Sequence, residues 1–222
     1  MKRTTLSIAT LLATLLMAAS GAARADAAAG GKLFQAKKCQ ECHYTSGPAK
    51  EKTIADQIAK KGPELWYAGS KFQKEWLGKW LQDPKPIRSL KYNSLTEKNA
   101  GNHPKLAAPD AVAMTDFLMS LTSKEVKEGV IKPKVTPKGR LIFTKNMPCS
   151  GCHQFPGKGF LGGTNGPSLV DAGERLNPDW VFAYLKDGSK TFKPVRQMPV
   201  FAGLMNEQDM QAVAEFVATF KK

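Results

Sequence analysis

The chain has 222 residues, of which 33 are Lys or Arg and 19 are Asp or Glu, giving a formal net charge of +14 at pH 7. This length permits one or two small domains. Beyond the N-terminus no apolar stretch is long enough to span a bilayer, which excludes a protein built from several spanning helices. In halves of about 100 residues, the protein core alone gives marginal stability.

The N-terminus predicts export. Lys2 and Arg3 form a basic start, residues 6–17 are an apolar run, and 23–25 read Ala-Arg-Ala, an A-x-A cleavage site. These features are typical of a secretory signal peptide, which we place at 1–25. The apolar run is short for a spanning helix, so an uncleaved anchor is the less favoured alternative. We expect the mature protein to have no transmembrane segment and to be periplasmic.

Two copies of C-x-x-C-H contain all four cysteines and two of the three histidines. They are Cys39, Cys42 and His43 in the first half and Cys149, Cys152 and His153 in the second. Two thiols at this spacing lie on one face of a helical turn, where both can form thioethers to one porphyrin. The adjacent histidine then becomes the proximal iron ligand. The sequence therefore predicts two covalently bound haem c groups.

Three other uses of these cysteines are weaker interpretations. A thioredoxin-like redox pair needs a βαβ setting and no following histidine, and a zinc ribbon would bring its two pairs much closer in sequence. Structural disulfides suit an oxidising compartment but do not explain a histidine at the same offset twice.

The spacing of apolar residues predicts helices around 109–121 and 206–220, the second with Asn206 as N-cap, and no run alternates as a strand would. We therefore expect an all-α fold. We place an N-terminal domain at 26–123, an exposed linker rich in proline and lysine at 124–138, and a C-terminal domain at 139–222.

The two halves repeat the same landmarks in the same order. Each has a glycine and a phenylalanine before C-x-x-C-H, then Gly-Pro-x-Leu, an aromatic-rich segment, and His-Pro or Met-Pro ahead of a final helix. The Gly-to-Phe segments are 31–34 and 139–143, the Gly-Pro-x-Leu segments 62–65 and 166–169, and the aromatic-rich segments 76–83 and 180–187. This order resembles class I c-type cytochromes, here in tandem.

The resemblance implies contacts within each domain. An aromatic residue of the first helix should touch one of the last helix, and a proline carbonyl should accept the Nδ1–H of the proximal histidine, which orients the ring. The implied aromatic pairs are Phe34 with Phe117 and Phe143 with Phe216, and the implied prolines are Pro63 and Pro167.

The resemblance also suggests the sixth ligand of each iron. Met198, followed by Pro199, stands where the family places its methionine ligand; Met147, Met205 and Met210 compete less well. The first domain departs from the pattern, because His103-Pro104 occupies the equivalent place. We expect His/Met ligation in the second domain and bis-His ligation in the first. The loop over 84–102 is either a cover for a haem edge, a partner surface or a plain insertion.

Two functions are compatible with this sequence. The favoured one is electron transfer from a donor through the bis-His haem to the His/Met haem and on to an acceptor. The alternative is a dihaem oxidoreductase, peroxidase-like or acting on sulfur compounds, with His103 as a labile ligand. A haem-based sensor is weaker because no output domain follows. The basic charge suggests periplasmic redox partners with acidic docking surfaces rather than nucleic acid.

Overall fold

The computed structural model describes residues 27–147, 149–157, 161–188 and 190–222. The signal peptide expected at 1–25 lies outside these residues. The described chain is helical and pairs extended backbone only in isolated β-bridges, which confirms the all-α prediction. None of its described helices is long and apolar enough to cross a membrane.

The first half begins with a helix over 27–36, which runs towards the first haem motif. The elements that follow are η1 (Cys39–Glu41), α2 (Ile54–Ala59), α3 (Ala68–Lys71), α4 (Lys74–Gln82) and α5 (Ala108–Ser120). A capping box between Thr53 and Asp56 starts α2, and a proline occupies the first turn of α5. In this half α4 packs on α5, and its buried residues belong to a hydrophobic cluster that also includes residues of the second half.

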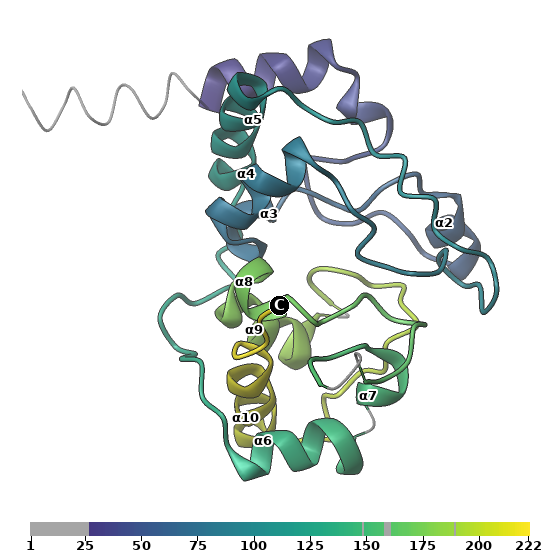
Figure 1. The fold of residues 1–222 in the computed structure, drawn as a ribbon, viewed down its shortest axis with the longest axis vertical. Coiled ribbons are helices and arrows are strands. Elements are labelled where there is room, and N and C mark those ends of the chain that lie inside the picture. The colour runs from purple at the N-terminus through teal and green to yellow at the C-terminus, as the bar shows by residue number, and fades with distance from the viewer. Residues whose placement is uncertain (1–26, 148, 158–160, 189) are drawn as a thin grey trace, which may run out of the picture.

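The second half repeats this arrangement below the first in Figure 1. Its elements are α6 (Pro137–Leu141), η2 (Ile142–Asn146), α7 (Cys149–Cys152), α8 (Ala172–Arg175), α9 (Pro178–Asp187) and α10 (Glu207–Val217). Asn206 caps α10, as expected, by accepting a hydrogen bond from the Asp209 amide at 2.9 Å. The last helix packs on both α6 and α9.

The first and last helices of each half cross with an aromatic contact. The ring centroids of Phe34 and Phe117 are 5.5 Å apart, and those of Phe143 and Phe216 are 5.8 Å apart. Both pairs implied by the family resemblance are therefore in contact. Phe34 and Phe143 are almost completely buried, so each crossing lies at the centre of its core.

A glycine allows the backbones to approach closely at each crossing. A Cβ added to Gly30 would overlap the carbonyl of Ala113, and one added to Gly139 would overlap the carbonyl of Ala212. Gly30 and Gly139 are therefore the equivalent positions. This corrects the sequence alignment, which paired Gly139 with Gly31; a Cβ on Gly31 would make only ordinary contact with a ring.

Most residues of the segment over 124–138 are exposed, but the segment is docked at two apolar side chains. Val126 and Ile131 are 7% and 2% exposed. The Asp179 carboxylate of α9 accepts hydrogen bonds from the amides of Gly129 at 2.6 Å and Ile131 at 2.7 Å. Proline and lysine content predicted an exposed tether, but two apolar side chains and a carboxylate on a distant helix fix this segment to the second half.

The two halves meet across a local two-fold relation. Phe72 and Leu176, which occupy equivalent positions in the repeat, form an antiparallel β-bridge. The hydrogen bonds around it are exchanged between equivalent residues. They run from the Gln73 amide to the Arg175 carbonyl at 2.9 Å and from the Asn177 amide to the Lys71 carbonyl at 2.8 Å. The turn between α3 and α4 therefore pairs with the turn between α8 and α9.

Candidate haem sites

Both C-x-x-C-H motifs form a single helical turn that closes on the histidine. The amide of His43 donates to the carbonyl of Cys39 at 3.0 Å, and the amide of His153 donates to the carbonyl of Cys149 at 3.0 Å. All four cysteines are unpaired, which rules out the disulfide interpretation in this structure. The turn brings each cysteine pair and its histidine to the same local surface.

Each proximal histidine is held by the Gly-Pro segment of its own half. The Nδ1 atom of His43 lies 2.9 Å from the carbonyl oxygen of Pro63, and that of His153 lies 2.7 Å from Pro167 O. With the proton on Nδ1 as donor, Nε2 keeps its lone pair for a metal. The glycine before Pro63 makes room, because a Cβ on Gly62 would come within 2.5 Å of the His43 ring.

His103 lies opposite His43. Their ring centroids are 6.0 Å apart and the rings are tilted by 47°. If a metal lay between the rings, two metal–nitrogen bonds of about 2 Å each, together with the distance from each nitrogen to its ring centroid, would give a similar separation. The Trp80 ring lies beside His103, 4.8 Å between centroids, and its Nε1 donates to the carbonyl of Lys85 at 2.9 Å. The separation of the two rings is therefore compatible with a metal ion bound between them.

All of the predicted site residues line one cavity of about 1500 Å³. They are Cys39, Cys42, His43, Pro63 and His103 from the first half and Cys149, Cys152, His153, Pro167 and Met198 from the second. Single-ligand pockets usually measure about 300–1,000 Å³, so this cavity is large enough for more than one ligand. Among the competing methionines, Met147 also lines it, whereas Met205 and Met210 are buried core residues.

Burial controls the protonation of the possible ligands. It lowers the pKa of His43, His103 and His153, so all three imidazoles are neutral near pH 7 and able to bind a metal. Burial raises the pKa of Cys149 to about 11, unlike the lowered pKa of a redox-active thiol. Within the described residues no cluster of three or more His, Cys, Asp and Glu side chains could hold a metal, so a zinc ribbon is not formed.

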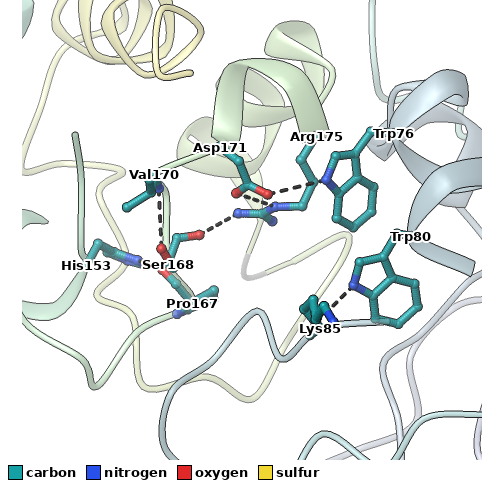
Figure 2. A network of polar contacts seen from close by, with 9 residues as sticks. All are labelled: Trp76, Trp80, Lys85, His153, Pro167, Ser168, Val170, Asp171 and Arg175. Carbon is teal, nitrogen blue, oxygen red and sulfur yellow. Dashed lines mark hydrogen bonds and ion pairs between the residues drawn. The ribbon is translucent and has the colours of Figure 1, made fainter. Parts of the chain in front are cut away.

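A polar network connects the second proximal histidine to the first half (Figure 2). The guanidinium of Arg175, which is 3% exposed, donates to the carbonyl of Ser168, next to Pro167, at 2.5 Å. The same guanidinium pairs with Asp171 at 3.1 Å, and Asp171 accepts a hydrogen bond from Nε1 of Trp76 at 3.3 Å. The indole on α4 of one half thereby reaches the segment that supports the histidine of the other.

Sequence reasoning missed this network. Arg175 corresponds to Lys71 in the repeat, and the two cations lie over equivalent indoles, Arg175 over Trp76 and Lys71 over Trp180. The signal available in the sequence was a cation three residues before the start of each aromatic-rich helix. That signal could indicate that Lys71 and Arg175 are equivalent, but not that each cation contacts an indole of the other half.

Comparison with known families agrees with this geometry. The cytochrome c family model matches residues 27–122, and the model for the cbb3-type cytochrome c oxidase subunit III matches residues 135–217. The chain belongs to the class I c-type cytochromes. Its two halves are cytochrome c domains in tandem, which bind haem c and have a haem electron-transfer role. No curated protein and no solved structure matched this cytochrome.

Proposed function

We propose that this cytochrome is an exported dihaem electron carrier, which takes electrons at the N-terminal haem and delivers them from the C-terminal haem. The proposal is supported by the two C-x-x-C-H turns, which open onto one continuous cavity. In each turn a proline carbonyl supports the histidine. Bound haem supplies one-electron redox chemistry, and the chain holds and orients it.

Four residues would attach the two porphyrins and four would bind the irons. The attaching residues are Cys39 and Cys42 in the first domain and Cys149 and Cys152 in the second. His43 and His103 would bind one iron, and His153 and Met198 the other. The 6.0 Å separation of the His43 and His103 rings supports the bis-His pair. For Met198, the support is its place on the cavity wall, in contrast to the buried Met205 and Met210.

The haem count is tested directly by a pyridine haemochrome assay on the purified protein. We expect two haems per chain in the wild type. Cys39→Ala and Cys149→Ala should each weaken the attachment of one haem and leave the other in place. One haem per wild-type chain would contradict the proposal.

Ligand identity sets the expected direction of electron flow. Imidazole stabilises ferric iron more than thioether does, so the bis-His haem should have a lower reduction potential than the His/Met haem. A redox titration should therefore resolve two midpoints, and Met198→His should bring them together. Equal midpoints in the wild type, or the reverse order, would contradict this assignment. Slow or absent binding of carbon monoxide to the reduced protein would favour a carrier over an enzyme.

The location and partners follow from the N-terminus and the charge. The signal-like segment at 1–25 supports export to the periplasm, where haem c proteins function. Without residues 1–25, which contain three basic and no acidic residues, the chain keeps a formal net charge of +11, which favours redox partners with acidic docking surfaces because opposite charges accelerate encounter. Electron transfer with such a partner should slow as the ionic strength rises.

A further inference from the structure

The loop over 84–102 of the first domain reaches the second domain's haem site. The carbonyl of Ile87 accepts a hydrogen bond from the amide of Ser168, next to Pro167, at 2.7 Å. The guanidinium of Arg88 donates to the carbonyl of Asn165, just before the Gly-Pro pair that supports His153. The first domain therefore contacts the proximal side of the second domain's site.

The same loop also touches the opposite side of that site. The side-chain amide of Gln197, next to Met198, donates to Oδ1 of Asn93 at 2.6 Å. Arg88, Asn93 and Gln197 all line the shared cavity. The loop thus bridges the segment behind the proximal histidine and the segment that carries the expected methionine ligand.

Three cations gather where the loop meets the second domain. Cζ of Arg88 lies 5.2 Å and Nζ of Lys193 lies 4.9 Å from the centre of the Tyr92 ring. Cζ of Arg196 lies 5.1 Å from the centre of the Tyr184 ring. All five side chains line the cavity, so two domains contribute positive charge to one part of its wall.

This positive charge lacks a counter-charge in the described protein. Nε and Nη1 of Arg196 are buried without a hydrogen-bond partner among the described residues. Burial and the charge of Arg88 lower the pKa of Lys193 to about 8, and Glu51, which acts in the opposite direction, is already paired with Lys60. All three cations are partly buried, and a cation withdrawn from water without an anion is costly, so an anionic ligand should occupy this region.

We propose that Arg88, Lys193 and Arg196 bind the carboxylates of the haem in the second domain, so that a loop of the first domain sets the charge around the second iron. The inference rests on the proposed function, since it requires a haem attached at Cys149 and Cys152. Thioether bonds leave the two carboxylates of a porphyrin free. Guanidinium groups suit carboxylates because they can donate two parallel hydrogen bonds.

The test is a redox titration of Arg88→Gln beside the wild type. Reduction adds negative charge, which a nearby cation stabilises, so loss of Arg88 should lower the midpoint of the His/Met haem. The bis-His midpoint should move less, although Arg88 belongs to that haem's domain. Arg88→Lys keeps the charge and should shift the midpoint less than Arg88→Gln. The matched control is Lys91→Gln in the same loop, whose exposed ammonium pairs with Glu97 and should change neither midpoint.

The outcomes separate this inference from the proposed function. A wild type with one haem refutes the proposed function, whereas two haems with an unmoved second midpoint in Arg88→Gln refute the inference alone. If Arg88→Gln and Arg88→Lys lost the second haem to the same extent, Arg88 would act by packing the loop. That result would overturn the proposal that its positive charge acts on the second haem.

A free anion in the cluster is tested with inorganic sulfate. The wild type and Arg88→Gln are titrated with and without sulfate at constant ionic strength. We expect sulfate to leave the second midpoint of both unchanged, because the porphyrin carboxylates already occupy the cluster. A sulfate-induced shift that disappears in Arg88→Gln would mean that the cluster takes free anions, and would overturn the assignment to haem carboxylates.

Discussion

His103 is the residue on which the character of the first site depends. It is half-buried, lies between His43 and Trp80, and its Nδ1 is 2.9 Å from the carbonyl oxygen of Pro104. When Nδ1 carries the proton and donates it to this carbonyl, Nε2 keeps its lone pair free, as it does in His43. In both imidazoles of the first site, a hydrogen bond from Nδ1 to a proline carbonyl therefore fixes the tautomer.

Replacing His103 should open the first iron. In His103→Ala, loss of the sixth ligand should give a high-spin spectrum for one haem, while the methionine-linked band of the second haem persists. Absorption and electron paramagnetic resonance spectra measure this directly, and added imidazole should restore the low-spin form. A low-spin spectrum unchanged by the substitution would show that another group supplies the sixth ligand.

At the scale of elements, the helix crossings hold each haem domain together. A glycine on the first helix lets it pack against the backbone of the last helix, and a phenylalanine one turn later fills the centre of the core. This contact brings the start and the end of each domain together, with the haem motif immediately after the first helix. The crossing thereby fixes the position of the C-x-x-C-H turn relative to the final helix.

Gly139→Ala should destabilise the second domain. The added methyl would overlap the carbonyl of Ala212, and overpacking of this kind costs about 1–3 kcal/mol. Thermal unfolding of the holoprotein should show the loss as a lower transition temperature. Gly78→Ala in α4 is the matched control, because its Cβ would be 3.4 Å from Oγ1 of Thr115 and alanine favours a helix by about 1 kcal/mol. Equal stability of the two variants would contradict the close crossing.

At the scale of the whole molecule, the two domains form one interface around Phe72 and Leu176. Hydrogen bonds between equivalent turns, cations over equivalent indoles, and a shared cavity all cross it. Such an interface places the two candidate haem sites beside one another. The segment over 124–138, which connects the two halves, is held to the second half through Asp179.

Asp171→Asn should weaken the interface. The substitution leaves the buried guanidinium of Arg175 without its carboxylate, and hydrogen bonds to charged groups contribute about 1.5–3 kcal/mol. We expect a loss of this size in urea unfolding, together with a change in the spectrum of the second haem through Ser168 and Pro167. Glu97→Gln removes a carboxylate from an exposed pair and should change stability little. Equal effects of the two substitutions would show that the buried network contributes no more than a surface pair.

The sequence by itself determined the chemistry and the fold class. The spacing of Cys39, Cys42 and His43, and its repetition, predicts haem attachment because thioether formation and proximal ligation need those groups on one helical turn. Periodicity predicted the helices that close each half, and the family resemblance implied the aromatic contacts of Phe34 and Phe143. These features depend on residues that are close together in the chain or that repeat in the same order, so they can be recognised in the sequence alone.

Only the tertiary structure decided how the domains cooperate. Lysine and proline predicted an exposed linker, and composition gave no sign that the Ile131 side chain is buried or that Asp179 on a distant helix accepts a hydrogen bond from its amide. The loop that carries Arg88 had three open interpretations, and its contacts with the second domain settled where it packs. Composition carries no information about which distant surface a polar side chain meets. Long-range pairing depends on how two folded domains fit together, and that fit is a property of their shapes rather than of any segment.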